Sequence, residues 1–246
     1  MLRLSRRVGR PLLLTTVPLG RRAAAESLGT GLLVMAVVGS GIAAQRLSPA
    51  DTGLQLFENA AATAAALAAI ILTFGPVSGA HLNPVVSLVA RVSGELTTSE
   101  AAVYTGAQVA GGLVGAMVAN LMYSLPAVEL STTSRTGSGH WLAEVVATFG
   151  LVLLVRSLIG SERTAVVPWA VGAYIGAAYF STSSTSFANP AVTLARTVTD
   201  TFAGIAWRSA PAFVAAQVAG GIVALLVARA LYPPSATRPN PEDLHG

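Results

Sequence analysis

The chain has 246 residues, of which 53% are hydrophobic and 11% charged, and its formal net charge is +4. Soluble domains carry about 25% charged residues, so this composition indicates a membrane protein. The arginines are scattered between apolar runs without an aromatic-studded basic face, which argues against nucleic-acid binding. The chain has no Cys and only three separated His residues, so we expect no metal site and no cofactor.

The two ends of the chain differ from its middle. Residues 1–22 hold a short apolar stretch between arginines, interrupted by Pro18, which does not fit a cleaved signal peptide. We expect a cytoplasmic arm there, or an artefact of the chosen start codon. The polar, Pro-rich residues 233–246 predict a disordered cytoplasmic tail. The predicted membrane domain is residues 23–232.

Six apolar segments follow the arm, each near the roughly 20 residues that cross a hydrocarbon core of about 30 Å. The second and the fifth are short. Six spans place both termini on one side, and eleven of the 15 arginines lie there if that side is the cytoplasm, which fits the positive-inside rule. We therefore expect a multi-pass protein of the plasma membrane with both termini cytoplasmic. The segments are Ala23–Ala44, Asn59–Gly75, Ala101–Leu121, Trp141–Ile159, Ala165–Phe180 and Ala210–Leu231.

Two Asn-Pro boxes lie outside the full spans, in "HLNPVVSLVAR" and "SFANPAVTLAR". Asn is a favoured N-cap residue and Pro is favoured at the first helical position, so each box predicts a helix start. About ten helical residues at 1.5 Å each cover about half of the hydrocarbon core. We therefore predict two half-helices that enter the membrane without crossing it. The boxes comprise Asn83, Pro84, Val85, Asn189, Pro190 and Ala191.

The two halves of the chain repeat three motifs in the same order. "AAESLGTGLLVM" is matched by "LAEVVATFGLVL", the Asn-Pro boxes match each other, and "GAQVAGGLVGA" is matched by "AAQVAGGIVAL". Each half holds three spans, an odd number, so the second copy enters the membrane in inverted orientation. We predict repeat one at residues 23–122 and an inverted repeat two at residues 140–232, with the half-helices meeting N-terminus to N-terminus near the midplane.

This arrangement predicts a pore. Non-helical backbone at membrane depth is tolerated where it lines a water-filled cavity, which we expect of the loops "GPVSGAHL" and "STSSTSFA". Each helix N-terminus carries about half a positive charge, and the amides of Asn83 and Asn189 are expected to point into the path. Small neutral solutes would pass such a constriction, whereas cations and protons would be opposed.

On these residues the chain resembles the aquaporin family, also called the major intrinsic proteins. The resemblance covers about residues 23–231 and rests on the paired boxes, the paired Glu26 and Glu144, and the paired "QVAGG" segments. It implies an all-α membrane protein with six transmembrane helices and two re-entrant half-helices, assembled as a homotetramer. It also implies that both glutamates accept hydrogen bonds from the re-entrant loops and that His81 lines the cytoplasmic vestibule. The alternatives are a Glu26 that sits at the interface beside Arg22, and a His81 that is simply hydrogen-bonded in place.

The selectivity filter departs from the family pattern. Water-selective members carry an Arg directly after the second Asn-Pro-Ala, where this chain has Val192. Counting along the matched loops places the other filter positions at Thr63, Ala177 and Ser186. All are small, so we expect a wide mouth without a fixed cation. The "NPAVT" motif with small filter residues resembles the bacterial branch associated with arsenite movement.

We therefore expect a passive channel for water, glycerol-like polyols and neutral metalloid hydroxides such as arsenite. A water-selective pore is one alternative. A solute-coupled secondary transporter is another, although such proteins usually keep a charged site at the midplane. We do not expect an enzyme, because Glu26 and Glu144 are the only carboxylates within the spans and lie on opposite sides of the midplane. The expected partners are the lipid bilayer, neutral solutes and other copies of the chain.

Overall fold

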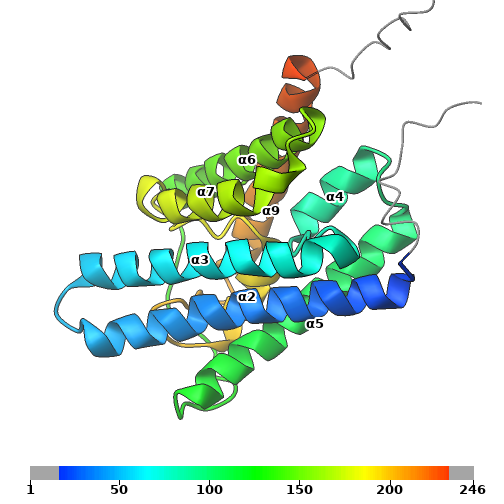
Figure 1. Cartoon of the computed structure of the whole chain (residues 1–246). Helices are drawn as coiled ribbons and strands as arrows, with labels where there is room; N and C mark the ends of the chain where they lie inside the picture. Colours follow the sequence, from blue (N-terminus) through cyan, green and yellow to red (C-terminus); the bar gives the residue numbers. More distant parts are fainter. Residues whose placement is uncertain (1–16, 233–246) are drawn as a thin grey trace, which may run out of the picture.

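Helices form the fold of residues 17–232, the part of the chain described by the computed structural model, and no strand occurs among them. Figure 1 shows long helices that run across the molecule, with the short α4 beside them. The elements in chain order are α2 (Leu19–Leu47), α3 (Thr52–Ser78), α4 (Pro84–Val92), α5 (Thr98–Met122), α6 (Ser138–Gly160), the 3-10 turn η1 (Thr164–Val166), α7 (Val167–Ser181), α8 (Pro190–Ala195), the 3-10 turn η2 (Arg196–Val198) and α9 (Ala210–Leu231).

Each predicted span corresponds to one helix, which confirms the expected architecture of six spans and two half-helices. Among the described helices, α2, α3, α5, α6 and α9 are long and apolar enough to cross a membrane. The second span is longer than expected, because α3 continues through Pro76 and reaches 27 residues. The fifth span, α7, is short as expected, with 15 residues. It covers about 22 Å at 1.5 Å per residue, and η1 directly precedes it.

The spans form two groups of three. In the first group α2 packs along α5 and α3, and in the second α6 packs along α9 and α7. Figure 1 shows α3 running beside α2, with α6 and α7 on the other side of α3. The groups meet where α3 contacts α7, and each half-helix also reaches across: α4 packs on α9, and α8 packs on α5.

Small residues allow the principal helix pairs to approach closely. A Cβ atom at Gly115 of α5 would collide with the carbonyl oxygen of Gly31 in α2, and one at Gly220 of α9 would collide with that of Val145 in α6. Helices in lipid associate through such small-residue contacts because no hydrophobic effect drives them together. The sequence repeat is therefore also a repeat of helix contacts.

The half-helices begin at the Asn-Pro boxes. Helix α4 has nine residues, and α8 has six and runs directly into η2. The side chain of Asn83 accepts a hydrogen bond from the N–H of Val85, and that of Asn189 accepts from the N–H groups of Ala191 and Val192. Each box thus forms a capped helix N-terminus with Pro at the first helical position.

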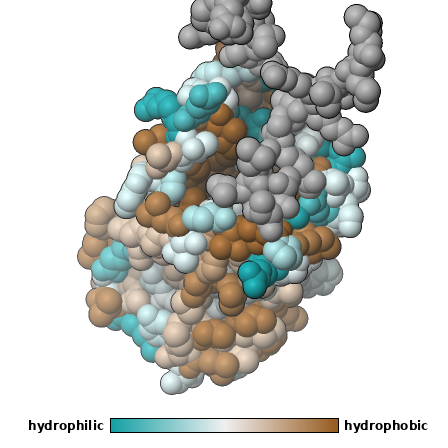
Figure 2. Space-filling view, turned by 45° about the vertical axis from the view of Figure 1, so that its right-hand side comes forward, coloured by the Kyte–Doolittle hydropathy of each residue, from teal (hydrophilic) through white to brown (hydrophobic). Residues whose placement is uncertain are grey.

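Large apolar side chains are widely exposed on the spans, as expected of a multi-pass membrane protein. Figure 2 shows hydrophobic residues over much of the visible face. Soluble monomers rarely expose such extensive apolar surface, whereas lipid accommodates it. Examples from five helices are Leu28, Phe57, Val114, Leu142 and Ile222.

The predicted N-terminal boundary is shifted. Helix α2 begins at Leu19, so residues 19–22 of the expected arm belong to the first helix. Arg22 is buried there and pairs with Glu100 of α5 at 2.6 Å. The remainder of the arm up to residue 16 and the predicted tail at residues 233–246 lie outside the described residues.

We expect Gly115→Ala to lower the free energy of unfolding by about 1–3 kcal/mol, because the added methyl overpacks against a backbone carbonyl that cannot rotate away. The matched control is Gly106→Ala on the same helix, where a Cβ would meet nothing within 4 Å. Thermal unfolding in detergent, read as the remaining monodisperse protein, measures both variants. Equal melting temperatures would contradict the close α2–α5 contact.

Candidate functional site

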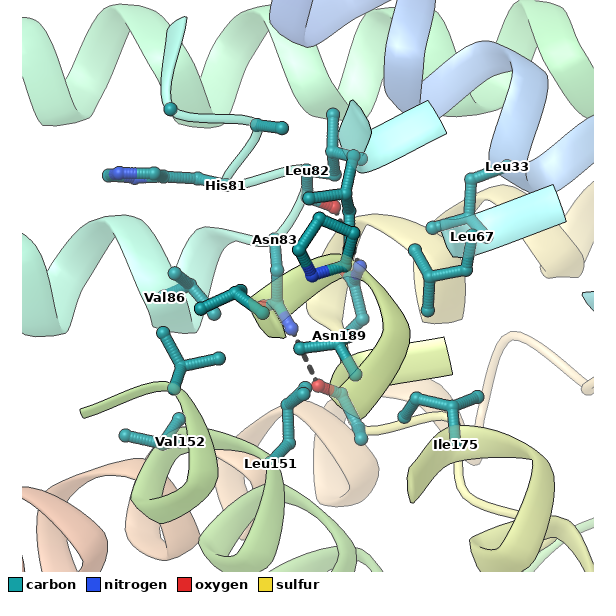
Figure 3. Close-up of a pocket in the computed structure, with 18 of the residues that line it drawn as sticks. Leu33, Leu67, His81, Leu82, Asn83, Val86, Leu151, Val152, Ile175 and Asn189 are labelled. Carbon is teal, nitrogen blue, oxygen red and sulfur yellow. Dashed lines mark hydrogen bonds between the residues drawn. The ribbon is translucent and has the colours of Figure 1, made fainter. Parts of the chain in front are cut away.

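A cavity of about 660 Å³ lies between the two groups of helices. Its walls are largely apolar, and Figure 3 shows Leu33 and Leu67 facing it from one side and Leu151 and Ile175 from the other. Both re-entrant loops also line it. One end lies at Arg156 and η1, and the opposite end lies at η2; these are called the Arg156 end and the Arg196 end below.

Asn83 and Asn189 line the middle of the cavity and join the two re-entrant loops (Figure 3). The Asn83 Nδ2 donates to the carbonyl oxygen of Ala188 at 2.7 Å, and the Asn189 Nδ2 donates to that of Leu82 at 2.7 Å. A side-chain amide has two N–H groups, so each Asn keeps a second donor for a molecule in the cavity.

The loops before the boxes share an unusual backbone. The fourth, third and first residues before each Asn have positive φ angles, a region that costs L-residues about 1–2 kcal/mol each. Such conformations persist only when surrounding contacts hold them. The angles are 86° at Gly79, 46° at Ala80 and 51° at Leu82 in the first loop, and 61° at Thr185, 52° at Ser186 and 47° at Ala188 in the second.

Glu26 holds the first loop. Its carboxylate is fully buried and accepts hydrogen bonds from the Ser78 hydroxyl at 2.6 Å and from the Gln108 amide at 2.7 Å. It also accepts from the backbone N–H groups of His81 at 2.9 Å and Leu82 at 2.7 Å. A buried charge is tolerated when it is fully hydrogen-bonded, as here.

Glu144 holds the second loop with the equivalent set of donors. Its fully buried carboxylate accepts from the Ser184 hydroxyl at 2.6 Å and the Gln217 amide at 2.6 Å. The backbone N–H groups of Phe187 and Ala188 each donate to it at 2.9 Å. The two loops are therefore fixed by one arrangement that occurs twice.

The alternatives for Glu26 and His81 can be compared with these contacts. Arg22 pairs with Glu100, and among residues 17–232 no hydrogen bond joins Arg22 to Glu26. His81 lines the cavity, and its Nδ1 lies 3.1 Å from the Ser87 hydroxyl. Its ring also packs edge-on against Tyr104. His81 therefore lines the cavity and is also hydrogen-bonded in place, and its vestibule role stays a prediction.

Three of the four predicted filter residues lie at the Arg196 end of the cavity: Thr63, Ser186 and Val192. Ala177 does not line it, since this residue is exposed on α7 and faces away. Tyr179 lines the cavity in its place, and its hydroxyl donates to the Thr63 hydroxyl at 3.2 Å. Both Ile175 and Tyr179, two residues to either side of Ala177, line the cavity, because two residues correspond to a rotation of about 200° around a helix.

Among the box residues, the two asparagines line the cavity and the others pack around it. Val85 is buried, and its side chain approaches Gly221 of α9. Ala191 is fully buried in α8. Pro84 and Pro190 occupy the first helical positions and do not line the cavity.

Sequence reasoning missed two charged features of the cavity. At the Arg156 end, Arg156 forms an ion pair with Glu95, and both line the cavity. At the opposite end Arg196 is buried and lines the cavity too. The sequence signal that could have identified both arginines is their position within or next to an apolar segment. Such a residue faces the protein interior or water by default.

Two inverted groups of spans, two half-helices capped by asparagine and a cavity between them define a membrane-channel fold. The family model for the Major intrinsic protein matches residues 13–186 and 160–243, and the chain belongs to this family. The resemblance to the aquaporin family found in the sequence is thereby confirmed. The family is one of channels and not of enzymes.

Known relatives match most of the chain. Aquaglyceroporin AqpS of Rhizobium meliloti (strain 1021) is 52% identical over 217 residues, covering 88% of this chain and 92% of the relative. The probable aquaporin TIP5-1 of Oryza sativa subsp. japonica is 30% identical over 234 residues, covering 88% and 86%. The X-ray structure of the aquaglyceroporin from Plasmodium falciparum has a TM-score of 0.70 at 21% identity, covering 88% of this chain and 98% of that chain, which supports the fold.

We expect Glu144→Gln to destabilise the protein by about 1–3 kcal/mol, because the amide replaces an acceptor oxygen with a donor that faces other donors. The second re-entrant loop should then loosen, and solute permeability should fall. Glu129→Gln is the matched control, since Glu129 is exposed and its side chain has no hydrogen bond within residues 17–232. Thermal unfolding in detergent and solute uptake by proteoliposomes measure both effects. Wild-type stability of Glu144→Gln would show that the carboxylate does not hold the loop.

Proposed function

We propose that the chain is a passive channel for water and small uncharged solutes, in particular glycerol-like polyols and neutral metalloid hydroxides such as arsenite. The observation that carries the proposal is the cavity between the repeats, with apolar walls and the Asn83 and Asn189 amides at its middle. Few hydrogen-bonding groups on apolar walls let a neutral solute bind weakly enough to leave again. Similarity to a protein named an aquaglyceroporin supports polyols as solutes.

The small side chains at the Arg196 end support solutes larger than water. Val192 occupies the position where water-selective relatives carry an Arg, and Thr63 and Ser186 beside it are small. Arsenite in neutral solution is an uncharged trihydroxide, so its size and hydrogen-bonding groups resemble those of glycerol. We infer that the two solutes share this path.

A water-selective pore remains the second candidate, and Tyr179 favours it. Its ring stands where small Ala177 was expected and narrows the cavity at Thr63. A coupled transporter has less support. Glu26 and Glu144 are engaged by four donors each, and Glu95 is paired with Arg156, which leaves these carboxylates poorly suited to bind a coupling ion.

We also propose the assembly and orientation that the resemblance and the arginine distribution predicted. The protein is a homotetramer of the plasma membrane with one pore per subunit, and both termini face the cytoplasm. The Arg156 end of the cavity then opens to the cytoplasm and the Arg196 end opens outside. Family membership supports the tetramer, and the positive-inside rule supports the orientation.

We expect Val192→Arg to reduce glycerol permeability by at least about tenfold while water permeability is largely kept, because a guanidinium narrows the mouth. Stopped-flow light scattering of proteoliposomes under glycerol and water gradients measures both. Ala177→Val is the matched control, because that side chain is exposed away from the cavity.

Three results would change this proposal. Glycerol entry equal to that of protein-free liposomes, with fast water, would establish the water-selective candidate. Loss of glycerol entry in Ala177→Val would mean that Ala177 faces the path after all. Saturable, proton-dependent uptake would favour the coupled transporter.

Orientation is testable with single cysteines, because the natural chain has none. Ser134 and Ser161 are exposed in loops at opposite ends of α6. We expect a membrane-impermeant maleimide to label Ser134→Cys in intact cells and Ser161→Cys only after permeabilisation. The reverse labelling pattern would place the termini outside the cell.

A further inference from the structure

Arg196 shares one face of the second half-helix with Val192. Helix α8 continues directly into η2, which begins at Arg196. Val192 and Arg196 are four positions apart and therefore lie on adjoining turns, and both line the cavity. The corresponding arginine of repeat one, Arg91, lies one residue further from its box, which is a rotation of about 100°. Arg91 is accordingly exposed, and its Nε donates to the Thr98 hydroxyl at 2.7 Å. A one-residue difference between the repeats thus turns one arginine toward the cavity.

The Arg196 head group is held in place without being neutralised. Its side chain is 3% exposed, its Nε donates to the carbonyl oxygen of Ala203, and its Cζ lies 3.4 Å from the centroid of the Phe187 ring. Ring and carbonyl fix the position of a guanidinium and leave its net charge in place. The two Nη atoms have no hydrogen-bond partner among residues 17–232.

A buried cation without a counter-ion is costly, and in a membrane protein it marks a functional position by default. The ion pairs among residues 17–232 are Arg22–Glu100 and Arg156–Glu95, so no carboxylate there lies within ion-pair distance of Arg196. Arg135 approaches the same Phe187 ring, with its Cζ 5.2 Å from the centroid, but does not line the cavity. The cavity is therefore the place from which water or solute can solvate it.

A second group at this end of the cavity also lacks a partner. The Ser186 hydroxyl lines the cavity, its residue is 4% exposed, and its oxygen has no hydrogen-bond partner among the described residues. A buried hydroxyl without a protein partner needs a water or ligand oxygen. Ser186 and Arg196 are thus two polar groups that the fold leaves for the contents of the pore.

We propose that Arg196 supplies the fixed positive charge at this end of the pore, one helical turn from Val192, and that its Nη atoms and the Ser186 hydroxyl hydrogen-bond the oxygen atoms of passing uncharged solutes. Arg196 is then a specificity-determining residue that repels cations, while Val192 leaves room for solutes. This inference rests on the proposed channel function.

The test removes the charge and then restores it in the same protein. Arg196→Gln and Arg196→Cys are reconstituted in liposomes, and sodium influx and glycerol uptake are measured for each. We expect sodium influx at least about tenfold above wild type, because the fixed cation of the filter is lost. Arg208→Gln is the control, since it removes an exposed arginine near the same end that does not line the cavity.

Charge rescue separates this effect from misfolding. The chain has no other Cys, so 2-aminoethyl methanethiosulfonate modifies Arg196→Cys at that site alone and adds an ammonium group. We expect this reagent to suppress the sodium leak and neutral methyl methanethiosulfonate to leave it unchanged. Suppression by both reagents would mean that the pore was merely blocked and would overturn the inference.

Three further outcomes would count against the role of Arg196 or against the channel function. A variant that takes up glycerol and excludes sodium as wild type does would refute the role of Arg196 and leave the proposed channel function intact. Failure of both variants to assemble as monodisperse protein would show that Arg196 is only a structural residue. Wild-type liposomes that take up no glycerol would instead refute the solute channel itself.

Discussion

The structure depends on satisfying irregular backbone at membrane depth. Two loops lie between the spans with several residues in the left-handed region, and their N–H groups have no lipid partner. Glu26 and Glu144 each accept two of these N–H groups together with a hydroxyl and an amide. These contacts set the loop conformation, which in turn places Asn83 and Asn189 at the half-helix starts.

The duplication explains why both loops are held in the same way. It also shows which cavity-lining residues differ between the two repeats. Each loop is fixed by its own glutamate, and each Asn donates to the carbonyl that precedes the other Asn. Equivalent residues of the two repeats differ at positions that do not hold the loops. His81 corresponds to Phe187, and the exposed Arg91 corresponds to the buried Arg196. The support is therefore symmetric, whereas the chemistry of the two ends is not.

The architecture could be predicted from the sequence because the patterns that indicate it are local or occur twice. Apolar runs, the capped Asn-Pro boxes and the paired Glu26 and Glu144 follow from lipid and helix chemistry. The filter was harder, because a side chain's direction depends on the residue count through an irregular loop. Counting places the expected filter position at Ala177, on the outward face of α7, whereas Tyr179 two residues later lines the cavity. Arg196 was not predicted for the same reason. Its direction depends on its spacing from the Asn-Pro box, and a difference of one residue decides whether the side chain faces the cavity as Val192 does.

The positions of the charges support the proposal that a pore can function with valine at position 192. At the Arg156 end the ion pair with Glu95 leaves little net charge. The half-helix N-termini make the middle positive, and Arg196 adds an unpaired cation at the opposite end. A cation meets a repulsive region from either side, whereas a neutral solute meets hydrogen-bond donors. Under the role proposed for Arg196, the charge comes from the next helical turn, and the residue at position 192 sets the width of the pore alone.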